Sequence, residues 1–311
     1  MTENNWVSYK NGNYTVAMDL ANGTKIRYNN LDFFKADRPE NIDIKITNKC
    51  NMGCPFCHEN STCDGKHSDA LNSKFIESLP EWTECALGGG NLLEYPDLVP
   101  LLRKMKELHL ISNITVNQKH FMENLSFLRE LNNQKLIYGL GISLVDPYQE
   151  GFISAVKTFP NAVVHVINGV VTTSGLTALG CKGLKILILG YKEVRRGATY
   201  KADTRHTVDF YMDNLYTSLP FIAKHEWFKT ISFDNLALKQ LKPERFLSKE
   251  FFEKHFMGDD GLDGTQSSAS FYADLVDGVF ARNSCDVNHR YPIENMTATD
   301  CYQFLRDLKE D

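Results

Sequence analysis

Short apolar runs alternate with amphipathic segments from residue 41 onward. Six of the runs have the length and composition of buried strands, and they cover residues 42–47, 85–90, 111–117, 138–144, 162–168 and 184–190. Between them, apolar residues recur at helical spacing. The two clearest stripes are Leu98, Leu101, Leu102, Met105 and Leu108, and then Phe121, Leu125 and Leu128. Strands that alternate with helices predict a parallel sheet with covering helices, here six βα units.

The start of the chain carries hairpin signals instead. Three β-rich runs, at 6–10, 14–18 and 24–28, are joined by Asn11-Gly12 and Asn22-Gly23, so they predict an antiparallel meander. Two interpretations of this meander remain open. It is either a lid or recognition flap near an active site, or a sheet that closes the bottom or side of the main unit.

After the sixth strand, residues 203–224 predict one long helix, and residues 230–233 predict a seventh short strand. The segments 270–276 and 279–282 flank Asp277-Gly278 and predict a second hairpin, which a final amphipathic helix follows. Residues 259–264 resemble a calcium loop only superficially, because Gly261 stands where a ligand is needed, and we interpret them as a turn.

Length and composition are consistent with one catalytic unit. A chain of 311 residues, 42% apolar, can bury a full core, and a single α/β barrel of about 200 to 250 residues with appendages fits it. We predict a meander and linker at 1–40, a barrel at 41–235 and a C-terminal extension covering the barrel at 236–311. A net charge of −5 makes nucleic acid an unlikely partner.

Cysteine usage and hydropathy bear on the compartment. Eight cysteines, with no apolar signal segment at the start of the chain, favour the cytoplasm, where thiols stay reduced. No run approaches the ~20 apolar residues that a membrane span needs. We therefore expect a soluble cytoplasmic protein without a membrane partner.

Candidate chemistry is concentrated in three cysteines directly after the first predicted strand. Cys50, Cys54 and Cys57 have C-x3-C-x2-C spacing. Three thiolates this close can hold a soft metal centre, and an iron–sulfur cluster is the favoured one. In a four-iron cluster the missing fourth ligand leaves one iron open to a small molecule. Zinc is the alternative, but structural zinc sites use four ligands and the chain has no second C-x2-C pair.

This loop resembles that of the radical S-adenosylmethionine (SAM) superfamily, whose members share the spacing and an aromatic residue before the third cysteine, here Phe56. The resemblance implies a partial (β/α)6 TIM-like barrel with a 4Fe–4S cluster on Cys50, Cys54 and Cys57. In that family the open iron chelates SAM. One electron, from a donor such as flavodoxin or ferredoxin, then splits SAM to a 5′-deoxyadenosyl radical that abstracts a substrate hydrogen.

The same resemblance implies SAM contacts at the ends of the next strands. Gly88, Gly89 and Gly90 stand where the superfamily has a Gly-Gly-Glu motif that binds the SAM amino group, although the glutamate is absent here. A side chain at Gly89 is expected to fill space that the methionine part of SAM needs. Asn117 and Ser143, which end the third and fourth strands, are expected to contact SAM, although such residues also end strands for local turn reasons.

The sequence thus predicts a radical SAM enzyme that acts on a small molecule, nucleotide or peptide. One alternative is an activating enzyme that installs a glycyl radical on a partner protein, because the run from Cys54 to His58 resembles the loop of such activases. A non-enzymatic iron–sulfur or zinc module is less favoured. The polar segment 285–291 is a candidate substrate-facing wall. The remaining cysteines receive no catalytic role; they are Cys63, Cys85, Cys181, Cys285 and Cys301.

Overall fold

The computed structural model describes residues 5–31, 33–256 and 268–308. Its main sheet has the strand order β10-β9-β8-β7-β6-β5-β4-β11-β12-β13. The bounds are β4 (Asn41–Thr47), β5 (Glu84–Gly89), β6 (Ile111–Asn117), β7 (Gly139–Ser143), β8 (Ala162–Ile167), β9 (Lys185–Leu189), β10 (Thr230–Phe233), β11 (Ser270–Asp274), β12 (Val279–Ala281) and β13 (Tyr291–Pro292). From β10 to β11 in this order, neighbouring strands pair in parallel, whereas β12 pairs antiparallel with both β11 and β13. The fold is therefore mixed α/β with a large parallel sheet.

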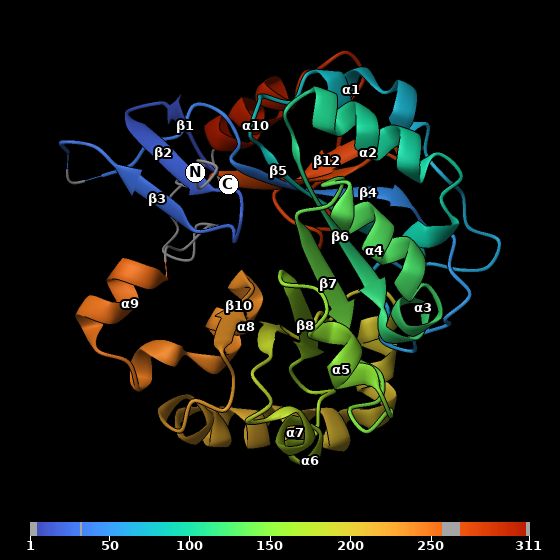
Figure 1. The fold of residues 1–311 in the computed structure, drawn as a ribbon, viewed down its shortest axis with the longest axis vertical. Helices are drawn as coiled ribbons and strands as arrows, with labels where there is room; N and C mark the ends of the chain where they lie inside the picture. Colours follow the sequence, from blue (N-terminus) through green and yellow to red (C-terminus); the bar gives the residue numbers. More distant parts are fainter. Residues whose placement is uncertain (1–4, 32, 257–267, 309–311) are drawn as a thin grey trace.

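Helices follow the strands and cover the sheet, with α2 to α5 along the outer side of β5 to β8 (Figure 1). The bounds are α1 (Lys74–Glu77), α2 (Leu98–Glu107), α3 (Gln118–Glu123), α4 (Leu125–Asn133), α5 (Phe152–Val156), α6 (Thr173–Leu179), α7 (Arg196–Lys224), α8 (Asn235–Leu241), α9 (Lys249–His255) and α10 (Ala298–Asp307). The first predicted stripe is confirmed, because Leu98, Leu101, Leu102 and Met105 of α2 are buried. The second stripe is divided between α3 and α4, because Asn124 leaves the helical conformation.

The seven predicted parallel strands are present, with ends that differ by a residue or two. The predicted long helix is α7, which begins earlier, at Arg196, and is interrupted at Thr204. The predicted turn at 259–264 lies outside the described residues. Within the residues that are described, no helix is long and apolar enough to cross a membrane.

The C-terminal hairpin is present but does not form a separate covering layer. Strand β11 pairs with β12 as predicted, and its other edge pairs in parallel with β4, so that Asp274 stands opposite Lys45. The sequence of β11 explains this central place. Four of its five residues are buried, as expected for a strand covered on both faces.

The N-terminal meander forms a sheet of its own, from β1 (Trp6–Asn11), β2 (Tyr14–Asp19) and β3 (Lys25–Tyr28). It packs against the amino ends of the parallel strands. Lys25 Nζ lies 2.6 Å from a carboxylate oxygen of Glu84, the first residue of β5, and the Asn161 side chain, just before β8, donates to the carbonyl of Ala21. The meander therefore closes the bottom of the main unit, which decides between the two interpretations left open by the sequence.

A buried carboxylate holds this contact together. Glu40, which precedes β4 and is 0% exposed, accepts hydrogen bonds from Arg27 at 2.8 Å and from the Tyr14 hydroxyl at 2.5 Å, and lies 3.1 Å from Lys25 Nζ. Burial alone would raise the pKa of Glu40. The hydrogen bonds from Arg27 and the charge of Lys25 outweigh burial and lower it instead. An ionised Glu40 thus fastens the meander to the main sheet.

Replacing Glu40 by alanine should lower the free energy of unfolding by about 3 kcal/mol, because Arg27 would lose its buried partner while keeping some contact with solvent. Urea denaturation measures this. Glu107→Ala, an exposed change on α2, is the control. The stabilisation should be complete above the ordinary carboxyl pKa near 4.5 and be lost as pH falls below it. Equal urea midpoints for the two variants would contradict this role.

Candidate active site

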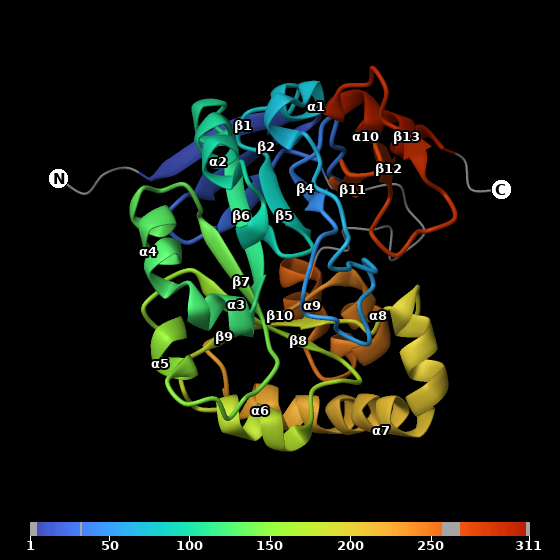
Figure 2. The same cartoon turned by 90° about the vertical axis from the view of Figure 1, so that its right-hand side faces the viewer.

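The cysteine loop leaves the carboxyl end of β4, on the side of the molecule away from the meander (Figure 2). It folds back on itself through backbone hydrogen bonds. The Cys50 amide donates to the Thr62 carbonyl at 2.8 Å, and the Asn48 amide donates to the Lys66 carbonyl at 3.0 Å. The chemistry of parallel sheets is located at the carboxyl ends of strands, so the loop occupies the expected end.

Three glycines hold the backbone just before Cys50. A Cβ on Gly89 would lie 2.1 Å from the Thr47 carbonyl oxygen, and one on Gly90 would lie 2.1 Å from the Lys49 oxygen. A Cβ on Gly65 would lie 2.1 Å from the oxygen of Asn48, the residue between them. The carbonyl groups of residues 47 to 49 therefore each lie so close to a glycine that a residue with a side chain would not fit in its place.

The predicted glycine run thus has two different parts. Gly89, at φ +113°, and Gly90 serve the approach of β5 to the cysteine loop, and the Gly90 amide donates to the Thr47 carbonyl at 2.7 Å. A Cβ on Gly88 would meet nothing within 4 Å. The open space expected for a ligand lies at Gly88, whereas a side chain at Gly89 would meet the end of β4.

The three loop thiols are free and partly exposed. Burial raises the pKa of Cys50 and Cys54, the nearby Cys57 thiolate raises both further, and Arg196 lowers them. No three His, Cys, Asp or Glu side chains of the described residues are already arranged as a metal-binding group. The donor set nevertheless fits a soft centre, because three unpaired thiols share one loop and influence one another's charge.

The first turn of α7 and the segment before it anchor the loop from another side. Phe56 packs edge-on against Tyr200, with ring centroids 5.7 Å apart. Arg196 donates to the Ser61 carbonyl at 2.7 Å, and Arg195 donates to the His58 carbonyl at 3.2 Å. Both arginines of this consecutive pair therefore bind the cysteine loop.

Asn117 and Ser143 come together at the carboxyl ends of β6 and β7, where they are register partners. The Asn117 side chain caps α3 by accepting from the Lys119 amide at 2.9 Å. Ser143 is in turn the register partner of His165 on β8. The structure thus gives Asn117 a local structural role, and its predicted contact with SAM stays a prediction.

His165 lies on the same face of the sheet as Thr115. Its ring fills the space over Gly141, where a Cβ would be 2.3 Å from the imidazole Cε1 and 2.8 Å from Thr115 Oγ1. Burial lowers the pKa of His165 to about 4, so the imidazole is neutral near neutral pH. A neutral imidazole at this face can accept or donate one hydrogen bond without adding charge.

Sequence reasoning missed a buried cluster of charged side chains behind the cysteine loop. Lys45, 3% exposed, lies 2.8 Å from Asp274 of β11 and 3.5 Å from Glu59 of the loop. Burial would raise the pKa of Glu59, but His58 and the charges of Lys45 and Lys192 hold it well below its usual range. A lysine among the isoleucines of the alternating strand 42–47 was the available signal, because lysine is almost never buried unpaired.

The polar segment 285–291 follows a residue, Ser284, that is linked to the cysteine loop through Lys192, and its role as a substrate-facing wall stays a prediction. Ser284 accepts from Lys192 Nζ at 2.9 Å, and the same nitrogen is 3.2 Å from the His58 ring. Within this segment Arg290 packs over the Tyr272 ring at 4.9 Å, whereas His289 is exposed. Arg290 therefore belongs to the buried cluster, whereas His289 faces solvent, as Val287 and Asn288 do.

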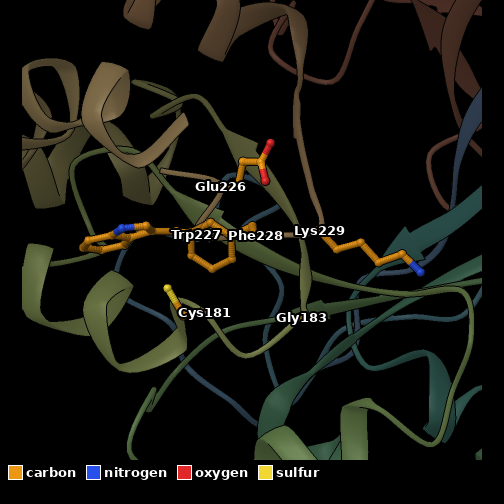
Figure 3. A pocket seen from close by; sticks show the side chains of 6 residues that line it. All are labelled: Cys181, Gly183, Glu226, Trp227, Phe228 and Lys229. Carbon is orange, nitrogen blue, oxygen red and sulfur yellow. The ribbon is translucent and has the colours of Figure 1, made fainter. Parts of the chain in front are cut away.

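A pocket of about 460 Å³ is lined by residues 181, 183 and 226–229 (Figure 3). Its lining comes from the residues just before β9 and β10, so it opens at the amino ends of those strands. The Cys181 sulfur lies next to the rings of Trp227 and Phe228, and Lys229 points away from them. This pocket is not part of the cysteine site. Cys85 and Cys301 are buried packing residues.

No protein-family model matches the sequence, and no curated protein matches it. The structure is similar to that of Streptococcus suis SuiB bound to S-adenosylmethionine, with a TM-score of 0.62, 13% identity, and coverage of 97% of this chain and 89% of that chain. It is also similar to SuiB bound to its precursor peptide SuiA, with a TM-score of 0.60, 13% identity, and coverage of 99% and 91%. At this identity the likeness establishes a shared fold over nearly the whole chain.

The two parts of the glycine run can be separated by substitution. Gly89→Ala should cost about 1 to 3 kcal/mol of folding free energy, because its left-handed backbone and the Thr47 carbonyl leave no room for a Cβ. Gly88→Val should leave the urea midpoint nearly unchanged and weaken SAM binding in a calorimetric titration. Unchanged SAM affinity in Gly88→Val would remove this position from the cofactor site.

Proposed function

We propose that this protein is a radical SAM enzyme that modifies a peptide substrate. The observation that carries the proposal is the C-x3-C-x2-C loop at the carboxyl end of β4, in a chain that shares its fold with a SAM-bound protein. The loop supplies the cluster ligands of the superfamily it resembles. The neighbour bound to a precursor peptide supports a peptide among the substrate classes that the sequence allowed.

In this proposal Cys50, Cys54 and Cys57 hold a 4Fe–4S cluster, and the space at Gly88 receives SAM. When bound, the two cofactors supply a 5′-deoxyadenosyl radical that takes a hydrogen atom from the substrate. The parallel strands from 41 to 235 act as the expected partial (β/α)6 barrel. Strands β1 to β3 close its bottom, and strands β11 to β13 extend its edge. A flavodoxin or ferredoxin in the cytoplasm would supply the electron.

The chain's own residues then position the reactants. The three glycine contacts fix the backbone before Cys50, and they thereby fix the position of this first proposed ligand. Ser143 and His165 form a polar stretch along the carboxyl ends of adjacent strands, which suits a neutral polar group of a substrate. Closing such a face over substrate would exclude water from the radical.

Iron analysis tests the ligand assignment. Anaerobically reconstituted protein should hold about four irons and four sulfides per chain. Replacing Cys50, Cys54 or Cys57 by alanine should abolish this content, while Cys301→Ala, a change in a buried core position, should preserve it. A full complement of iron after the loss of any loop cysteine would show that the ligands lie elsewhere.

Isotope transfer distinguishes the peptide enzyme from the activase. The reduced protein should cleave SAM slowly alone, and a true substrate should raise the yield of 5′-deoxyadenosine, because it places the abstractable hydrogen against the radical carbon. Deuterium at the reacting carbon of a peptide should then appear in 5′-deoxyadenosine by mass spectrometry. Label arriving from a glycine of a partner protein, with a lasting radical on that partner, would favour the activase instead.

A further inference from the structure

One carboxylate of the cysteine loop contacts three other parts of the fold. Glu59, two residues after Cys57, is 7% exposed. It accepts from the Tyr272 hydroxyl of β11 at 3.1 Å, and lies 3.5 Å from Lys45 Nζ of β4 and 3.5 Å from a guanidinium nitrogen of Arg195, just before α7. Through the Glu59 side chain, the cysteine loop therefore contacts β4, β11 and the start of α7.

The contact continues into the C-terminal segment. Lys45 also lies 2.8 Å from Asp274, whose other oxygen accepts from the backbone amides of Val276 and Asp277 at 3.1 Å. Arg290 lies 3.5 Å from Asp274 and donates to the Ser284 carbonyl at 3.1 Å. Charges of alternating sign therefore run from the cysteine loop through β4 to the turn and loop after β11.

Because Glu59 is buried, its contacts favour one conformation of the cysteine loop. An ionised carboxylate away from water is very costly unless it is paired and hydrogen-bonded. Glu59 finds a hydroxyl and two cations only in the position seen here. Movement of the cysteine loop would separate the carboxylate from all three, so its energy would rise with the displacement. The loop conformation is held by charge and hydrogen bonding, in addition to the glycine contacts before Cys50.

We propose that Glu59 is a positioning residue that keeps the cysteine loop in its ligand-holding conformation, and that strand β11 provides the support through Tyr272. That this conformation serves cluster binding rests on the proposed function. The contacts of Glu59 that hold the loop are present in the metal-free chain. One consequence follows for the C-terminal segment: it assists cluster binding although it supplies no ligand.

Site-resolved alkylation of the metal-free, reduced protein tests the support directly. In Glu59→Gln the three loop cysteines should react with iodoacetamide roughly tenfold faster than in the wild type, as expected for the loss of a charged hydrogen-bonded partner. Peptide mass spectrometry reads each cysteine separately. Cys181, which is exposed and lies just before β9, provides the reference rate, and the buried Cys301 should stay protected if the fold is intact. Glu59→Asp, which keeps the charge, should recover part of the protection.

Iron content after anaerobic reconstitution is the second measurement, and it should fall in Glu59→Gln and in Tyr272→Phe. Asp277→Asn is the matched control, because Asp277 is 58% exposed and only at 4.0 Å from Lys45. Loop alkylation and iron content equal to wild type in both test variants would overturn the proposal. If Cys301 loses protection in Glu59→Gln, that variant no longer has an intact fold, and the result for Tyr272→Phe alone supports or overturns the proposal. A wild type that binds no iron would refute the proposed function, while the alkylation rates would still decide the role of Glu59.

Discussion

Lys45 is a cation buried inside a central strand, and much of the structure around the cysteine loop depends on neutralising it. Its two carboxylate partners come from distant parts of the chain, Glu59 in the loop and Asp274 in β11. Burying a charge without partners would cost several kcal/mol. That requirement favours β11 beside β4 in the register that places Asp274 opposite Lys45, and it favours a loop that returns toward the sheet. The ammonium group of Lys45 therefore favours the positions that β11 and the cysteine loop take around it.

The two ends of the parallel strands have different roles. At the amino ends, Glu40 binds Arg27 and Lys25 and fastens the meander, so that end contributes stability. At the carboxyl ends, the cysteine loop and the polar residues at strand termini face outward from the sheet. Parallel sheets separate these tasks because every strand presents its carboxyl end on the same side. A charged cluster occurs at both ends, but only the one that contains Lys45 includes a residue of the cysteine loop, Glu59.

Local sequence patterns were sufficient for most elements of the fold and for the cysteine loop. Strand and helix periodicity, Asn-Gly turns and the C-x3-C-x2-C spacing all act over short stretches of chain. The unpredicted features depend on contacts between distant residues. Lys45 and Asp274 are 229 residues apart, and nothing local in residues 270–274 indicates that they pair with β4. The position of the meander was also undecided, because a hairpin signal specifies a turn and not what the hairpin packs against.

The glycines illustrate how one sequence pattern can have more than one physical reason. A glycine run at a strand end indicates close approach of the backbone to something, and the superfamily resemblance suggested SAM. In the structure the approaching group at Gly89 and Gly90 is the chain itself, at Thr47 and Lys49. Close backbone packing fixes the residue before Cys50 more rigidly than a side chain could, since it involves no rotamers. Gly89 and Gly90 thus fix the start of the cysteine loop, whereas Gly88, where a Cβ would meet nothing within 4 Å, leaves space beside it.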